Sequence, residues 1–222
     1  MPHKIILASA SPRRSTLLRQ IGIRFEVIPA ETDEHIRPGY HPSETVEQLA
    51  LEKAGDVARR HSGALVIGAD TVVVLDNEIL GKPANPEEAA SMLRTLSGRT
   101  HQVYTGVALV LAGQDANDGS PAASAPEHPQ SVTFHERTDV TFGGLSDDEI
   151  RAYISTGSPM DKAGSYGIQD DLGALFVRKI DGDYYNVVGF PLYRFHREVN
   201  KLAPGIVNPF ERHQRKNLLR NT

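Results

Sequence analysis

The chain of 222 residues contains no cysteine. It can therefore form neither a disulfide nor a thiolate metal site, which suits a reducing compartment. No apolar run is long enough to span a membrane, and the apolar run at residues 5–8 is too short for a signal peptide. We therefore expect a soluble, cytoplasmic protein with no membrane partner.

The chain also lacks an excess of positive charge, because its acidic residues outnumber its basic residues. The formal net charge of −4 at pH 7 argues against general nucleic-acid binding, which favours a basic surface. The tail at 204–222 carries several basic residues but little periodicity, so we expect it to be frayed. The sequence predicts no nucleic-acid partner.

Several common catalytic motifs are missing as well. The sequence has no GxxxxGK[ST] loop, no GxGxxG, no HExxH and no nucleophile elbow. Ser9 and Ser11 could be nucleophiles, but no histidine lies in a recognisable supporting context. We interpret His101 as a structural or edge histidine and not as a base. Any chemistry must therefore come from residues outside these motifs.

What the chain does contain is an alternation of strand and helix patterns. Strands are expected at 4–8, 25–28, 65–75, 102–111, 131–141, 174–180 and 187–188, and helices at 12–21, 43–61, 86–96, 146–155 and 192–202. This order predicts an α/β fold with a mixed sheet, in one domain that could have two lobes. The segment 113–130, rich in Gly, Pro, Ala and Ser, predicts a mobile hairpin loop.

The most informative stretch is residues 5–14, IILASASPRR. A buried strand leads through small residues to a helix start, where Ser11 fits the N-cap and Pro12 the first helical position. Arg13 and Arg14 then lie in the first turn, where the helix dipole disfavours cations. They are either solvated surface charges or an anion site, in which a phosphate would take the helix N–H groups and the guanidinium groups together.

Carboxylates interrupt the pattern at two places. Asp70 breaks the apolar run 65–74, and burying a carboxylate is costly unless it is paired or binds a metal. It is either functional or closes a turn after Gly68. The acidic segment 31–34 (ETDE) is either a solvated loop or is neutralised by a cation. We expect Glu34 to be the residue of this segment that points inward.

Two lysines and one glutamine complete the candidate set. Lys53 lies within a predicted helix, and Lys82 lies between Gly81 and a proline that keeps it extended. Each lysine alone is usually solvated, but together with the arginines they could form a cationic cleft for a polyphosphate. The glycine-punctuated segment 161–169 could present Gln169 to a base or a phosphate.

Taken together, these segments resemble the Maf family of nucleotide pyrophosphatases. The matching segments occur in order along nearly the whole chain: ASASPRR (8–14), ETDE (31–34), LALEKA (49–54), GADTVV (68–73), ILGKP (79–83), AASMLRTLSGRTHQVYTGV (89–107), PMDKAGSYGIQ (159–169) and GDYYNVVGFPL (182–192). The insert at 113–130 and the long tail depart from the family pattern, and neither touches a motif.

The resemblance implies an elongated mixed sheet in two lobes with a central cleft, similar to the inosine triphosphatases. It implies hydrolysis of a nucleoside triphosphate to the monophosphate and pyrophosphate, with Mg²⁺, Mn²⁺ or Co²⁺ as cofactor, and a homodimer. The SPRR, ADT and YGIQ motifs look like the dTTP/UTP subgroup, with modified pyrimidine nucleotides as further substrates.

The resemblance also implies roles for individual residues. Asp70 matches the catalytic acid/base of the family, and Arg13, Thr71 and Gln169 match its specificity positions. With Asp70 as general base, we expect Glu34 to share the metal with it. The remaining substrate-binding residues would be Ser9, Arg14, Lys53 and Lys82. The alternative, suggested by the family's historical link to cell division, is a non-catalytic nucleotide-binding regulator of septum formation.

Overall fold

A computed structural model describes residues 4–207, apart from 33–35, 38, 114–129 and 171. The predicted hairpin insert and tail lie for the most part outside the described residues, and so does Glu34. The strands are β1 (Lys4–Leu7), β2 (Glu26–Val27), β3 (Ala64–Leu75), β4 (Glu78–Leu80), β5 (Thr100–Leu111), β6 (Gln130–Phe142) and β7 (Val177–Asp181).

All of these strands belong to one mixed sheet. Its order is β2-β1-β3-β5-β6-β7, and β4 pairs with β3. β1 runs parallel to both β2 and β3, whereas the remaining pairs are antiparallel. The predicted α/β class with a mixed sheet is therefore confirmed.

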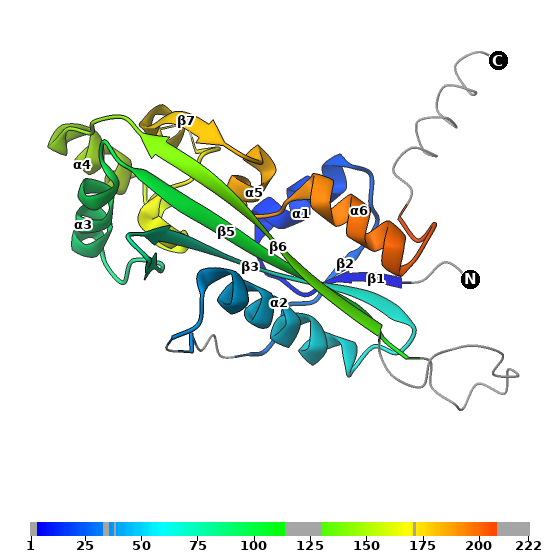
Figure 1. Ribbon diagram of the computed structural model, residues 1–222. Coiled ribbons are helices and arrows are strands. Elements are labelled where there is room, and N and C mark those ends of the chain that lie inside the picture. Colours follow the sequence, from blue (N-terminus) through cyan, green and yellow to red (C-terminus); the bar gives the residue numbers. More distant parts are fainter. Residues whose placement is uncertain (1–3, 33–35, 38, 114–129, 171, 208–222) are drawn as a thin grey trace, which may run out of the picture.

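Helices cover the sheet at both ends (Figure 1). They are α1 (Pro12–Gln20), α2 (Pro42–Ala58), α3 (Pro86–Leu96), α4 (Asp147–Ser155), α5 (Tyr184–Val188) and α6 (Leu192–Leu202), with short 3₁₀ turns η1 (Ser158–Asp161), η2 (Ala163–Ser165) and η3 (Gly173–Phe176). The predicted helix starts hold: the Ser11 side chain accepts from the Arg14 N–H with Pro12 following, and Ser146 and Glu149 form a capping box.

The long strand β3 contributes to separate cores along its length. Near its start, Leu65 packs with α1 and α6, while Val66 packs on the opposite face with α2. Near its end, Val73 and Leu75 pack with α3 and α4. Figure 1 shows these helix groups at opposite ends of the sheet. The expected two-lobed form therefore arises from long strands that serve two cores.

Two glycines let α2 approach the sheet closely. A Cβ added at Gly68 on β3 would lie 2.2 Å from the Ala50 carbonyl oxygen, and one added at Gly106 on β5 would lie 2.3 Å from the Val46 oxygen. Gly106 is the register partner of Asp70. The missing side chains therefore bring the α2 backbone against the part of β3 that carries Asp70.

Some predicted elements are wrong. Residues 187–188 end the helix α5 and form no strand, because Asp183 caps its start and Gly189, at φ 117°, ends it. The strand expected at 174–180 begins only at Val177, after η3, and β4 was not predicted. In the described part of the chain, no helix has the length and apolar character needed to cross a membrane.

Candidate active site

The site lies at an opening in the edge of the sheet. β3 pairs along one edge with β1 at residues 64–67 and with β4 at residues 73–75. Between these two stretches, at residues 68–72, the described residues pair β3 only with β5, which lies on its other side. The chain leaves β1 after Leu7 and turns into α1, which opens the edge where Asp70 and Thr71 lie. A cavity of about 560 Å³ occupies this position.

The cavity gathers the predicted site residues from distant parts of the chain. They come from the start of α1, from α2, from β3, from the segment after β4 and from the segment 161–169. Glu34 lies outside the described residues, so its position stays a prediction. The lining includes the other predicted residues Ser9, Arg13, Arg14, Lys53, Asp70, Thr71, Lys82 and Gln169.

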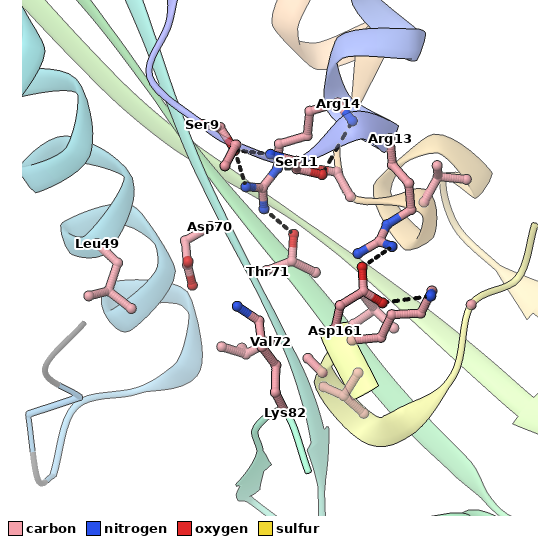
Figure 2. A pocket seen from close by; sticks show the side chains of 18 of the residues that line it. Ser9, Ser11, Arg13, Arg14, Leu49, Asp70, Thr71, Val72, Lys82 and Asp161 are labelled. Atoms are coloured by element: carbon pink, nitrogen blue, oxygen red, sulfur yellow. Dashed lines mark hydrogen bonds and ion pairs between the residues drawn. The ribbon is translucent and has the colours of Figure 1, made fainter. Parts of the chain in front are cut away.

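Asp70 forms a largely buried ion pair with Lys53. The Lys53 Nζ atom lies 2.6 Å from Asp70 Oδ1, and the two side chains are 12% and 10% exposed. The alternative that Asp70 closes a turn is wrong, because it lies inside β3. The expected partner for a carboxylate in an apolar strand is therefore supplied by α2. In Figure 2 the Asp70 carboxylate points into the space between α2 and Lys82.

Thr71 lies on the opposite face of β3, since successive strand residues alternate in direction. Arg14 binds it: Nη2 donates to Thr71 Oγ1 at 3.0 Å, Nη1 to Ser9 Oγ at 2.9 Å and Nε to the Gly189 carbonyl at 3.0 Å. The guanidinium group thus joins α1, β3 and the end of α5 (Figure 2). This network fixes Thr71 at the cavity wall.

Arg13 points toward the segment 161–169 and binds Asp161. Its Nη1 lies 3.1 Å from Asp161 Oδ2, and Asp161 Oδ1 lies 2.7 Å from Nζ of the buried Lys162, which is also 3.2 Å from Asp170 Oδ2. Burial alone would raise the pKa of Asp161, but the Lys162 ammonium and the Arg13 guanidinium outweigh it and hold the pKa below its ordinary value. This chain of alternating charges links α1 to the far wall of the cavity (Figure 2).

Asp161 and Lys162 were not among the predicted site residues. Their role depends on contacts with Arg13 and Asp170, which no local pattern indicates. One feature of the sequence could have indicated them: an acidic residue followed directly by a basic residue, at the start of a segment that contains several glycines.

Lys82 and Gln169 are exposed residues of the cavity lining. Within the described residues Lys82 makes no ion pair, and Figure 2 shows its side chain reaching into the space beside Asp70 and Thr71. Gln169 lies in a turn on the same loop as Asp161. Both can therefore bind a ligand without first breaking an ion pair.

The described residues of the cavity supply only part of the donor set that a divalent cation requires. No group of three or more His, Asp or Glu side chains that could hold a metal occurs among the described residues. Mg²⁺ is usually bound through one or two carboxylates, with phosphate oxygens and water completing its shell. Asp70 beside a cationic cavity fits an ion that is shared with a phosphorylated substrate.

The charges around the cavity favour a polyanionic ligand. Two arginines and three lysines line it together with the carboxylates of Asp70 and Asp161. Guanidinium and ammonium groups bind phosphate oxygens through charge-assisted hydrogen bonds, and a positioned carboxylate can accept a proton from water. The arrangement can therefore hold a polyphosphate beside a general base.

Several known proteins are similar to this chain. The dTTP/UTP pyrophosphatase of Bacillus mycoides (strain KBAB4) is 49% identical over 206 residues, which cover 93% of this chain and 99% of the relative. The dTTP/UTP pyrophosphatase of Bacillus anthracis is 50% identical over 199 residues, covering 90% and 95%. Among solved structures, the nucleoside-triphosphatase / dITP/XTP pyrophosphatase of Mycobacterium abscessus is 18% identical, with a TM-score of 0.38 over 63% of this chain and 74% of that one. The family model for Maf-like proteins matches residues 4–202, and the chain belongs to this family.

Proposed function

We propose that the protein is a nucleoside triphosphate pyrophosphatase that hydrolyses dTTP and UTP to the monophosphate and pyrophosphate. Membership of the family and relatives of this name at about half identity support the activity. The observation that carries it is the buried Asp70 carboxylate, paired with Lys53 at 2.6 Å and placed in a cavity lined by cations. Nucleotide binding alone does not require such a carboxylate, which disfavours a purely regulatory role.

In the proposed reaction, Asp70 accepts a proton from a water molecule that attacks the α-phosphorus. A new bond forms between this oxygen and the α-phosphorus. The bond to the oxygen that bridges the α- and β-phosphates breaks, and its electron pair leaves with pyrophosphate. The Lys53 ammonium donates to Asp70 Oδ1 and so fixes the orientation of the carboxylate. A base positioned in this way contributes about 10²–10⁴-fold to a rate.

The cationic side chains hold the phosphates during this step. Lys82, which is exposed at the cavity, can bind a phosphate directly. Arg13 already binds Asp161, so a phosphate must share its guanidinium group with that carboxylate or displace it. When bound, Mg²⁺, Mn²⁺ or Co²⁺ would neutralise charge on the phosphate oxygens. Asp70 and, as a prediction, Glu34 would hold this metal ion. Phosphoryl transfer mainly requires such positioning and charge stabilisation.

The uncharged polar side chains of the cavity can bind the pyrimidine ring of the nucleotide. Thr71 and Gln169 both line it, and a hydroxyl and a carboxamide can pair with the O4 and N3–H edge of uracil or thymine. A cytoplasmic location is part of the proposal, supported by the absence of cysteine. The homodimer implied by the family resemblance stays a prediction.

A panel of nucleotides tests the proposed activity. The protein is incubated with canonical and modified nucleoside triphosphates and with Mg²⁺, Mn²⁺ or Co²⁺, and pyrophosphate and phosphate are scored separately. We expect pyrophosphate and the monophosphate from dTTP and UTP. Release of single phosphates would point to a phosphatase and contradict the proposal. Tight nucleotide binding without turnover under every metal would instead favour the regulator of septum formation.

A further inference from the structure

The Thr71 hydroxyl stands at the end of a buried chain of hydrogen bonds. Thr71 and Thr105 are register partners on β3 and β5, and their Oγ1 atoms are 3.0 Å apart. Thr105 Oγ1 donates to the Asn186 carbonyl at 3.1 Å. Thr105 has no exposed surface, so no bulk water competes for its hydroxyl. The chain therefore connects the cavity wall to the backbone of α5.

The acceptor at the end of this chain fixes the direction of its protons. A hydroxyl has one hydrogen to donate and two lone pairs, whereas a carbonyl can only accept. When the hydrogen of Thr105 is given to Asn186, Thr105 can meet Thr71 only as an acceptor. Thr71 must then donate its own hydrogen to Thr105. The opposite direction would forfeit the bond from Thr105 to Asn186 in the protein interior, which is unfavourable.

Thr71 is consequently left as an acceptor toward the cavity. Its hydrogen is committed to Thr105, and one of its lone pairs takes the hydrogen donated by Arg14 Nη2. Within the described part of the chain, this oxygen makes no further hydrogen bond. The remaining lone pair can accept a hydrogen bond from a ligand, but the hydroxyl has no hydrogen left to offer.

The surroundings of Thr71 indicate which part of a nucleotide lies there. Apart from the Arg14 guanidinium group that binds Thr71, the nearby lining includes uncharged residues of β5 and α5, and a Cβ added at Gly189 would lie 3.6 Å from Thr71 Oγ1. The ion pair of Asp70 and Lys53 lies on the opposite face of β3. If the protein acts on nucleoside triphosphates, as proposed above, the neutral base belongs beside Thr71 and the charged phosphates beside Lys53 and Lys82.

We propose that Thr105 is a positioning residue that makes Thr71 an obligate acceptor, so that the pocket selects a base whose ring nitrogen donates a hydrogen bond. Uracil and thymine carry N3–H and satisfy the free lone pair of Thr71. Cytosine has an unprotonated N3 that can only accept, so two lone pairs would face each other. Selectivity for UTP and dTTP over CTP would thus depend on a residue that touches no substrate.

A variant of Thr105 tests this proposal. Thr105→Val keeps the β-branched shape but removes the hydroxyl, which frees the Thr71 hydrogen to turn toward the cavity and meet cytosine N3. We expect the ratio of kcat/KM for UTP to that for CTP to fall by about tenfold or more, which corresponds to one hydrogen bond. Thr105→Ser, which keeps the hydroxyl, should restore the ratio.

The chain offers a matched control on the same strand. Thr100 also lies on β5 and its Oγ1 is 2.8 Å from Thr141 Oγ1 on β6, but this pair is exposed and does not line the cavity. Thr100→Val therefore removes the same kind of hydrogen bond without reaching the base. Its UTP-to-CTP ratio should equal that of the unmodified protein.

Equilibrium binding separates this proposal from the proposed activity. Binding of UMP and CMP is measured by calorimetry, and the same change in ratio is expected in affinity. Unchanged ratios in Thr105→Val, with pyrophosphate still released from UTP, would overturn the role of Thr105 and leave the activity standing. Absence of any hydrolysis with a changed UMP-to-CMP ratio would overturn the activity alone.

One further measurement needs no variant and so does not depend on its folding. The unmodified protein is titrated with UMP and with 3-methyluridine monophosphate, in which a methyl group replaces the N3 hydrogen. We expect the methylated nucleotide to bind at least about tenfold more weakly. Equal affinities would show that N3–H is not read, and would overturn the proposal.

Discussion

The Nζ atom of Lys53 lies 2.6 Å from Oδ1 of Asp70, and both side chains are largely buried. The pair joins α2 to β3 at the opening in the sheet edge. It forms because Gly68, two residues before Asp70 on the same face of β3, leaves room for the α2 backbone. The geometry of the proposed base therefore depends on backbone packing as well as on charge.

Gly68→Ala should damage both stability and activity. The added Cβ would lie 2.2 Å from the Ala50 carbonyl oxygen, a backbone atom that can move only with α2. Overpacking of this kind costs about 1–3 kcal/mol, and a displaced α2 carries Lys53 away from Asp70. Urea unfolding and pyrophosphate release measure the two effects. Gly144→Ala is the control, because nothing lies within 4 Å of its added Cβ; equal behaviour of the two variants would contradict the packing argument.

Asp70→Asn should abolish most of the activity while preserving the fold. The amide oxygen has the same shape and can still accept from Lys53, but it cannot take a proton from water at neutral pH. We expect kcat for UTP to fall by about 10²–10⁴-fold. Circular dichroism checks the fold. Asp76→Asn, at an exposed residue just after β3 that binds Arg99, should keep full activity. Turnover of UTP by Asp70→Asn at the normal rate would refute the assignment.

Lys82→Ala should weaken substrate use without affecting stability. Lys82 is exposed, so its removal should change the free energy of unfolding by less than about 0.5 kcal/mol. Loss of one charged contact to a phosphate should lower kcat/KM by about tenfold or more. Lys179→Ala, at an exposed lysine on β7 outside the cavity, controls for the loss of one positive charge. If both variants lower kcat/KM equally, the effect is general and Lys82 has no specific role.

Protonation of His101 should make the protein less stable in mild acid. Its Nε2 lies 2.8 Å from the hydroxyl of Tyr166, a residue of the cavity lining, and burial lowers the pKa of His101 from 6.5 to about 4. The unfolded chain therefore binds more protons between these values, and the free energy of unfolding falls as the pH drops through this window. The contribution is roughly 2 kcal/mol between pH 7 and pH 4.5.

The variant His101→Gln isolates this contribution. Glutamine does not titrate, so the fall in the free energy of unfolding from pH 7 to pH 4.5 should be smaller than in the unmodified protein by about that amount. Urea unfolding at both pH values measures it. The same fall in both proteins would show that His101 is not the group responsible.

Local signals were sufficient for much of the fold. The cap at Ser11 and the capping box at Ser146 fixed the starts of α1 and α4, and the interrupted apolar run of β3 singled out Asp70. Burying a carboxylate in such a run costs free energy unless the carboxylate has a partner, so the need for a partner can be inferred from the sequence. The identity of that partner, Lys53, is a tertiary contact and became visible only in the folded chain.

Other features could not be predicted because nothing local determines them. The two valines at 187–188 are compatible with a strand, and only the cap at Asp183 and the left-handed Gly189 make them the end of a helix. Asp161 and Lys162 acquire their role through contacts with Arg13 and Asp170. Thr105 is an ordinary strand residue until its register partner is known to be Thr71.

The position of attack on the triphosphate tests the central claim most directly. UTP is hydrolysed in water enriched in ¹⁸O with Mg²⁺ present, and the products are analysed by mass spectrometry. The account predicts UMP that carries one ¹⁸O atom together with unlabelled pyrophosphate, and loss of both products in Asp70→Asn. Label in pyrophosphate, or formation of UDP and phosphate, would place the attack at another phosphorus and contradict it.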